Sequence, residues 1–331
     1  MTNSTNEIGV VVIGRNEGER LKRCLQSVIS QVECIVYVDS GSSDGSVEYA
    51  ESLKVDVVRL DMKIPFSAGR ARNEGFQRLS ENNKTVKYFQ FIDGDCDMCG
   101  GWLSFASVYL ENNKYCAVVA GRRCEKFPKS TVYNLLCDIE WNTPVGETES
   151  CGGDFMIRKE AFRQVNGFNP AVIAGEEPEM CYRLRKKNWL IVRLNHSMTL
   201  HDAAITRFSQ WWTRAVRSGH AYAHEYALHA HDGQGYCFKE SAKSWFWALV
   251  FPMAVFVLGL TFHVIFFWLY MAYFIQFAKI SLNTFRRLGN VKHSMVYSIF
   301  TVIAKWPQFI GQLIFLKRKM SQSGFSIIEY N

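Results

Sequence analysis

Short hydrophobic-rich runs alternate with amphipathic segments through the first hundred residues. The runs occupy residues 8–13, 34–38, 55–60 and 88–92, and apolar residues at helical spacing follow each of the first three. Continuous β-branched and aromatic runs are typical of buried parallel strands, whereas a spacing of three and four residues predicts amphipathic helices. The alternation predicts an α/β fold with a mostly parallel sheet. We place this domain at residues 8–205, after a flexible N-terminus at residues 1–7.

A much longer apolar stretch follows at residues 245–280. A continuous helix over it would extend roughly 54 Å, well beyond the bilayer core of about 30 Å. We therefore predict a transmembrane or re-entrant helical hairpin that turns near residues 259–263; the alternative is a buried hairpin of a soluble domain. Residues 206–244 are predicted to form an amphipathic, interfacial connection. Residues 281–331 are predicted to form an interfacial amphipathic helix and a cytoplasmic tail.

Charge and composition narrow the class of protein. A hydrophobic content of 48% excludes a disordered chain, and ten cysteines suit a reducing compartment. The formal net charge is +7, and basic residues flank the apolar stretch on both sides: Lys239, Lys243, Arg286, Arg287 and Lys292. Positive residues stay cytoplasmic, so the soluble part is expected at the cytoplasmic face of the inner membrane. Because the charge gathers at the membrane flanks, we expect no nucleic-acid partner.

Three carboxylates follow the fourth predicted strand. Asp93, Asp95 and Asp97 occupy alternate positions in FIDGDCD. Unpaired carboxylates are costly to bury, so the cluster needs either hydrogen-bonded caps or a divalent cation such as Mg²⁺ or Mn²⁺. In parallel sheets, ligands gather beyond the carboxyl ends of the strands, which is where this cluster lies. The sequence contains neither of the glycine-rich motifs of dinucleotide and P-loop binding.

The order of VVIGRNEGERL, VDSGSSDGS, SAGRARNEGF, FIDGDCD and AGEEPEMCYRLR resembles the inverting family 2 glycosyltransferases of the GT-A fold, over residues 8–205. The resemblance implies a nucleotide-sugar donor. It would place Asp39 on the donor's base and Asp95 on a metal that bridges the diphosphate, with His201 as a second metal ligand. The other residues that it assigns to the donor are Ile13 and Arg15 at the base pocket, Arg72 near the nucleotide, Asp93 toward the ribose, Gly94, and Gly153 with Asp154 at the sugar. Simpler interpretations remain for several of them, namely helix or turn capping, surface charge and a structural histidine.

Inversion requires a carboxylate that removes the acceptor's proton. Glu176 and Glu177 begin a predicted helix, where negative charge is favourable. The resemblance assigns the base to Glu177 and acceptor orientation to Glu176. The family more often carries an aspartate at this position, which leaves the choice between the two open. A capping pair of carboxylates is the alternative.

A tryptophan-rich segment follows the predicted domain. It contains Trp211, Trp212 and Arg214, predicted to contact the acceptor or the membrane interface. Their order differs from the Q-x-x-R-W of processive synthases, which favours addition of one sugar per encounter. Histidines 220, 224, 229 and 231 are interpreted as solvated or interfacial.

These patterns predict a membrane-associated, inverting, metal-dependent glycosyltransferase. It would move a sugar from a nucleotide sugar, with UDP as the expected nucleotide, to a lipid-linked saccharide. Exopolysaccharide or surface-glycan assembly would be the setting, with other glycan-assembly proteins as partners. The alternatives are a polyprenyl-phosphate glycosyltransferase similar to dolichol-phosphate-mannose synthase and a catalytically inactive subunit that binds a sugar nucleotide.

Overall fold

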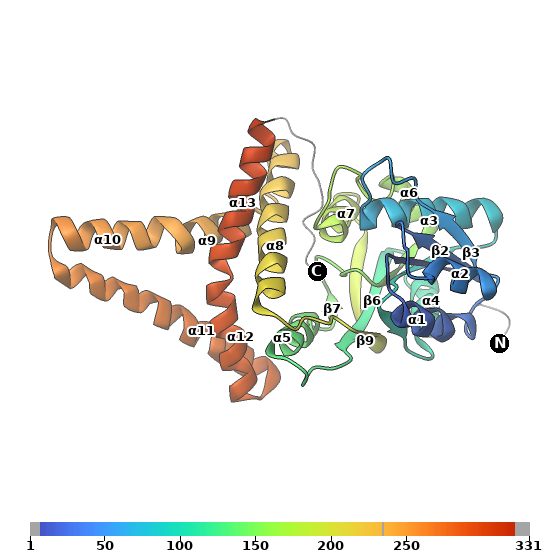
Figure 1. The fold of residues 1–331 in the computed structure, drawn as a ribbon, viewed down its shortest axis with the longest axis horizontal. Helices are drawn as coiled ribbons and strands as arrows, with labels where there is room; N and C mark the ends of the chain where they lie inside the picture. Colours follow the sequence, from blue (N-terminus) through green and yellow to red (C-terminus); the bar gives the residue numbers. More distant parts are fainter. Residues whose placement is uncertain (1–6, 234, 322–331) are drawn as a thin grey trace. The chain divides into compact units, whose positions relative to one another are not determined.

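The computed structural model describes residues 7–233 and 235–321 and divides the chain into two compact units. The first unit comprises the chain up to residue 128 together with residues 140–204; the second comprises residues 129–139 and the chain from residue 205 onward (Figure 1). The segment 129–139 therefore belongs with the C-terminal helices, which the sequence pattern did not predict. Most of the predicted flexible N-terminus and the end of the predicted tail lie outside the described residues.

The first unit is built on one mixed sheet with the order β3-β2-β1-β4-β8-β6-β9-β5, and β7 pairs with β9. The parallel half, β3 to β4, confirms the strands predicted from the hydrophobic runs. The other half is mixed, because β8 runs antiparallel to β4 and β6, and β5 and β7 run antiparallel to β9. The strands are β1 (Ile8–Gly14), β2 (Cys34–Asp39), β3 (Asp56–Arg59), β4 (Tyr88–Asp93), β5 (Cys96–Met98), β6 (Cys116–Glu125), β7 (Gly146–Glu147), β8 (Phe155–Arg158) and β9 (Leu190–His201).

Helices pack onto this sheet through the apolar faces that the spacing predicted. In α1, for example, Leu21, Leu25 and Val28 are buried. Helix α3 approaches β1 so closely that a Cβ on Gly75 would lie 2.3 Å from a side-chain carbon of Val11. The helices are α1 (Glu19–Ile29), α2 (Ser46–Ser52), α3 (Ala68–Asn82), α4 (Trp102–Asn112), α6 (Lys159–Gln164) and α7 (Glu176–Arg185); α5 (Val132–Trp141) begins in the second unit and ends in the first.

The register of the parallel strands brings their polar ends together. Gly14 pairs with Asp39 across β1 and β2, and Ile13 pairs with Asp93 across β1 and β4. The polar residues that follow these three strands therefore lie at one edge of the sheet, as expected for a ligand site in such a fold.

The second unit is helical and strongly apolar. Its elements are α8 (Phe208–Leu228), η2 (Ala230–Asp232), α9 (Phe238–Trp245), η3 (Phe246–Val250), α10 (Phe251–Thr261), η4 (Val264–Tyr270), α11 (Met271–Leu288), α12 (Val291–Ile303) and α13 (Lys305–Met320). By length and composition, three helices in the described part of the chain are able to cross a membrane: 238–261, 264–288 and 291–320. The last of them lies within residues 281–331, for which the sequence predicted an interfacial helix and a tail, and that placement stays a prediction.

The first two of these helices form a hairpin. The chain reverses direction at Phe262 and His263, inside the predicted turn region, and the two arms extend together from the rest of the unit (Figure 1). The hydroxyl of Tyr273 donates a hydrogen bond to the carbonyl of Trp247 at 2.6 Å and so joins the two arms. Most apolar side chains of the hairpin are exposed, as expected for a surface that lipid would cover.

Helix α13 packs along α8 (Figure 1) and also contacts the start of the first hairpin arm, where Trp245 Nε1 donates to Gln312 at 3.0 Å. Glycines allow the two backbones to touch, because a Cβ on Gly219 would lie 1.9 Å from the carbonyl oxygen of Gln308. The pairing also buries His220 and His224 against Phe315. The interpretation of these two histidines as solvated or interfacial is therefore wrong.

The side chain of Trp211 likewise belongs to the interior of the second unit. It is 4% exposed and packs on Phe300 of α12 with ring centroids 4.9 Å apart. A ring covered in this way is not free to stack on a sugar or to anchor at lipid headgroups, so the prediction for Trp211 is corrected to a packing role. Trp212 is half-buried beside Phe208. For Trp212 and Arg214, the acceptor or interface role stays a prediction.

Candidate functional site

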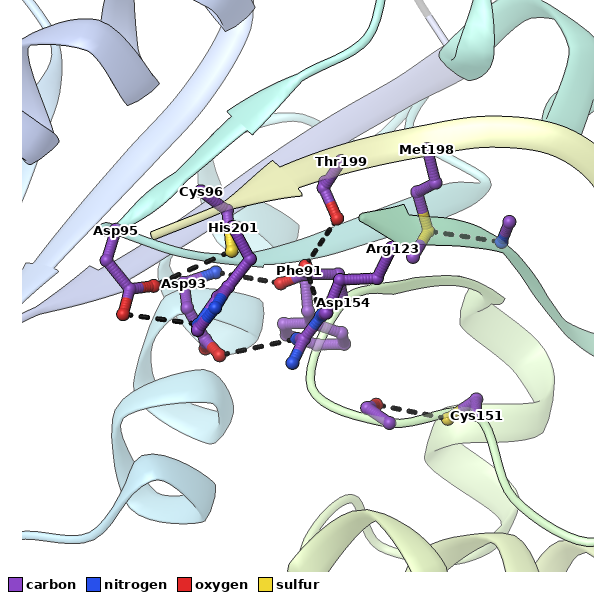
Figure 2. Close-up of polar contacts among 12 residues, drawn as sticks. Phe91, Asp93, Asp95, Cys96, Arg123, Cys151, Asp154, Met198, Thr199 and His201 are labelled. Atoms are coloured by element: carbon purple, nitrogen blue, oxygen red, sulfur yellow. Dashed lines mark hydrogen bonds and ion pairs between the residues drawn. The ribbon is translucent and has the colours of Figure 1, made fainter. Parts of the chain in front are cut away.

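Asp95 and His201 lie together at the sheet edge. Their neighbourhood follows from strand pairing, because Cys96 of β5 is directly opposite His201 of β9. His201 Nε2 lies 3.3 Å from Asp95 Oδ2 (Figure 2), and the backbone N–H of Asp202 donates to the carbonyl of Asp95 at 3.2 Å. With the thiol of Cys96, these side chains form a cluster whose potential ligand atoms all lie within 4.8 Å of one another.

Further carboxylates surround this pair. Burial alone would raise the pKa of Asp95, but the neighbouring His201 lowers it to about 2. Burial and the charges of Asp95 and Asp93 raise the pKa of Glu17 to about 7, against the opposing effect of Arg20. The sequence motifs assigned no role to Glu17. Its position between the end of β1 and the start of α1, where ligands gather in this type of sheet, could have indicated one.

These residues fit a divalent cation. They offer carboxylate oxygens and one imidazole nitrogen at the end of a strand pair. The pKa of Glu17 is raised first by burial and then by the charge of Asp95, so negative charge is concentrated beside these ligand atoms. Oxygen ligands suit both Mg²⁺ and Mn²⁺, and an imidazole nitrogen favours Mn²⁺. Asp97 is not part of this set, because it pairs with Lys126 and Arg23.

Arg72 links the acidic cluster to the two glutamates. It is 2% exposed, and its Nη2 lies 2.7 Å from Asp93 Oδ1. Its Nη1 lies 3.0 Å from Glu177 Oε1 and 3.2 Å from Glu176 Oε1. The alternative of a surface charge is wrong for Arg72, because the structure buries it as a bridge between three carboxylates. Its place near the nucleotide stays a prediction.

Of the two glutamates at the start of α7, Glu177 is the more accessible. Its side chain is 14% exposed, against 7% for Glu176. Burial, followed by the charge of Glu176, raises the pKa of Glu177 to about 7, although Arg72 opposes the shift. A carboxylate with a pKa near neutrality is suited to proton transfer.

Asp154 is a buried carboxylate that holds other residues of the site in place. It is fully buried, and its carboxylate accepts hydrogen bonds from the backbone N–H of Asp93 at 3.1 Å, from Arg123 Nε at 2.9 Å and from the Thr199 hydroxyl at 2.7 Å (Figure 2). The sequence led us to expect that Asp154 contacts the donor sugar. The structure corrects this, because its oxygens are engaged inside the protein and it positions Asp93 and Arg123.

The backbone of Gly153 lies against the same group. A Cβ at this position would lie 2.8 Å from both Asp93 Oδ2 and Arg123 Nη2, so only glycine fits without displacing them. The structure thus packs this glycine against the acidic cluster, and its contact with the donor sugar stays a prediction. Nothing in the sequence marks Arg123 as a site residue, because it lies inside a strand without a recognisable motif.

The loops after β1 and β2 form the remaining part of the edge. The carboxylate of Asp39 accepts hydrogen bonds from the backbone N–H groups of Gly41 and Ser42, both at 2.9 Å, and is 3% exposed. It therefore caps its own turn, the simpler of the two interpretations, and a contact with the donor's base stays a prediction. Arg15 is exposed, with its guanidinium over the ring of Phe66 at 4.6 Å.

Ile13 and Gly94 hold the β1 and β4 ends together. The N–H of Gly94 donates to the carbonyl of Ile13 at 2.7 Å, and a Cβ on Gly94 would meet that oxygen at 3.1 Å. The role of both residues in binding the donor stays a prediction.

Comparison with known families identifies this arrangement. The model of the family described as glycosyl transferase family 2 matches residues 9–165, and the model described as N-terminal domain of galactosyltransferase matches residues 137–206. The chain carries a family 2 glycosyltransferase domain. The two matched ranges of this glycosyltransferase domain include the acidic cluster, both glutamates and His201, whereas Trp211, Trp212 and Arg214 lie beyond them.

Two curated relatives resemble part of the glycosyltransferase domain. The uncharacterized glycosyltransferase YibD of Escherichia coli K12 is 34% identical over 100 residues, which are 29% of this chain and 28% of YibD. Glycosyltransferase AglE of Haloferax volcanii is 30% identical over 111 residues, 31% of this chain and 35% of AglE. The matches thus span about a third of the length of these relatives.

A solved structure extends the likeness in fold. The mannosyltransferase PcManGT from Pyrobaculum calidifontis, in complex with GDP-Man and Mn²⁺, superposes with a TM-score of 0.60 at 15% identity, over 92% of this chain and 87% of that chain. This likeness supports the GT-A fold of the glycosyltransferase domain.

Proposed function

We propose that this protein is a membrane-associated, inverting glycosyltransferase that transfers a sugar from a nucleoside-diphosphate donor to a lipid-linked saccharide. The observation that carries the proposal is the meeting of Asp95 and His201 with Glu177 at one sheet edge, joined through Arg72 and Asp93. A cation site and a carboxylate of near-neutral pKa are the two groups that inverting transfer from such a donor requires.

The donor's diphosphate would lie at the Asp95 and His201 end of the edge. A divalent cation held there supplies stabilisation of the negative charge that develops on the departing diphosphate. Asp95 and His201 would hold the cation, and the carboxyl of Glu17 lies beside them. Asp154 and Arg123 fix the orientation of Asp93, which faces the ribose in this proposal.

Glu177 would act at the acceptor. Its carboxylate removes the proton of the acceptor hydroxyl as that oxygen attacks the sugar carbon from the face opposite the diphosphate. Arg72 holds the side chain at 3.0 Å and keeps a fixed positive charge beside it, which favours return to the ionised form after the proton has left to solvent. Glu176, the less exposed of the two, anchors the same guanidinium at 3.2 Å.

The helical unit would tether the enzyme to the bilayer. The hairpin arm of residues 238–261 extends about 36 Å, enough to cross a core of about 30 Å. Since α8 and α13 pack together, we infer that this pair lies at the interface and that the glycosyltransferase domain faces the cytoplasm of a cell with an inner membrane. A tether of this kind favours an acceptor that is itself held in the membrane. We therefore place the enzyme in exopolysaccharide or surface-glycan assembly, where it would act with other assembly proteins.

The test uses the full-length protein in lipid nanodiscs with Mn²⁺. Donor hydrolysis is first measured over a panel of UDP-, GDP- and dTDP-sugars, and the preferred donor is then offered with polyprenyl phosphate or with a polyprenyl-diphosphate-linked saccharide. Mass spectrometry of the lipid product distinguishes the proposed transfer from the synthesis of a polyprenyl-phosphate sugar. Donor binding without hydrolysis or transfer by the wild-type protein, under conditions where an Asp95→Ala variant behaves identically, would show an inactive binding subunit.

A further inference from the structure

Trp141 is a half-buried aromatic side chain that the proposed reaction leaves without a role. It ends α5 and belongs to the first unit. Its ring meets the imidazole of His201 edge to face, with centroids 4.6 Å apart and planes at 81°. The guanidinium carbon of Arg123 lies 5.3 Å from the centroid of the same indole. One ring therefore contacts both the histidine beside Asp95 and the arginine that pairs with Asp154.

The imidazole of His201 lacks the support that metal-binding histidines usually have. Such a histidine normally donates its second ring N–H to a carboxylate or carbonyl, which fixes the orientation of the ring. Here Nδ1 is buried and, among the residues that the structure describes, has no hydrogen-bond partner, while Nε2 lies 3.3 Å from Asp95 Oδ2. The edge-to-face contact with Trp141 supplies an orienting force of a different kind.

The contact with Arg123 fixes the indole in turn. A guanidinium over an aromatic face is attracted by the electrons of the ring. The side chain of Arg123 is itself held in position, because its Nε lies 2.9 Å from a carboxylate oxygen of the fully buried Asp154. A chain of contacts therefore leads from Asp154 to Arg123, from Arg123 to Trp141 and from Trp141 to His201.

We propose that Trp141 is a positioning residue of the metal site, which holds the His201 imidazole with Nε2 toward Asp95. The inference rests on the proposed function, because it takes His201 as a ligand of the divalent cation. Trp141 itself touches neither cation nor substrate in this scheme. Its loss should therefore weaken binding of the metal more than it slows turnover once the metal is bound.

The experiment compares Trp141→Phe with Trp141→Leu in the full-length protein. Both side chains are apolar and smaller than tryptophan, but only phenylalanine keeps a ring against His201 and Arg123. Free Mn²⁺ is measured by electron paramagnetic resonance during titration with Mn²⁺ alone. We expect the leucine variant to bind Mn²⁺ about 10-fold or more weakly, as for other residues that orient a metal-binding histidine, and the phenylalanine variant to stay within about threefold of wild type. In saturating Mn²⁺ the kcat of the leucine variant should approach that of the wild type.

Trp189→Leu is the control. Its indole donates to Gln164 at 2.9 Å, and its removal should leave Mn²⁺ binding unchanged. The inference is overturned if the leucine and phenylalanine variants bind Mn²⁺ with equal affinity, whether both match the wild type or both are weakened to the same extent. If the leucine variant does not fold, Trp141→Met takes its place with the same expectation. A wild-type protein that binds no Mn²⁺ would instead contradict the proposed metal-dependent function.

Discussion

Arg72 Nη1 lies 3.0 Å from Glu177 Oε1 at the start of α7. The same side chain reaches Asp93 with its other terminal nitrogen at 2.7 Å, so one buried cation joins the proposed base to the acidic loop after β4. The base is thereby coupled to the donor side of the site through a single residue.

Replacing Glu177 with glutamine should remove the proton acceptor while keeping the shape of the side chain. We expect transfer to fall by about 100-fold or more, the range in which general bases contribute, with donor affinity changed only a few-fold. Initial rates of transfer and donor titration measure the two quantities. Glu176→Gln serves as the matched control and should lose far less transfer activity. Equal losses in both variants would contradict the assignment of the base to Glu177.

Transfer should also depend on pH through Glu177. Burial raises the pKa of this carboxyl to about 7, and a base works only when deprotonated, so kcat/KM should rise with pH below about 7 and level off above it. The measurement is a pH profile of kcat/KM at saturating Mn²⁺. In Glu177→Gln the residual activity should lose this rise, and a profile that stays the same in the variant would assign the pH dependence to another group.

Removing the Arg72 guanidinium should destabilise the fold as well as the site. Arg72→Ala leaves the buried Glu176 and the partly buried Asp93 and Glu177 without their shared cation. Breaking a buried pair costs about 3–5 kcal/mol of the free energy of unfolding. Denaturant unfolding of the wild type and the variant measures the loss. Arg78→Ala on the same helix removes an exposed pair with Asp56 and should change stability little. A similar small effect at both positions would refute the bridging role.

A methyl group at residue 153 should disturb the acidic cluster. The Cβ of alanine would lie 2.8 Å from Asp93 Oδ2 and from Arg123 Nη2, so we expect Gly153→Ala to lose most of its transfer activity. Gly100→Ala is the control, because no atom lies within 4 Å of a Cβ there. Activity assays on both variants, with circular dichroism as a check on folding, test this. Full activity in Gly153→Ala would mean that the loop moves away from Asp93 at little cost.

The tip of the hairpin should reach the far side of the bilayer. Both arms, residues 238–261 and 264–288, are long enough to cross, so a cysteine in place of His263 should react with a membrane-impermeant maleimide added on the side opposite the glycosyltransferase domain. The wild-type protein, whose cysteines lie elsewhere, provides the background of labelling. Labelling of His263→Cys only from the side of the domain would indicate a re-entrant hairpin.

The sequence by itself determined the parallel half of the sheet, the acidic loop and the reversal of the apolar stretch. These features depend on local patterns, namely continuous hydrophobic runs, spacing along a helix and the length of an apolar segment, and local patterns are readable without knowledge of distant contacts. The resemblance in motif order likewise indicated the family that the matches at residues 9–165 and 137–206 support.

Tertiary structure alone decided which partner each polar side chain has. Arg72, Asp154 and Trp211 were expected to face ligand, solvent or membrane, yet each is buried, because strands and helices distant in sequence close over them. Arg123 and Trp141 carried no motif, and they acquire a role only because β6 and the end of α5 bring them beside His201. Burial and pairing of charge depend on the packing of distant segments, and sequence spacing does not encode such packing.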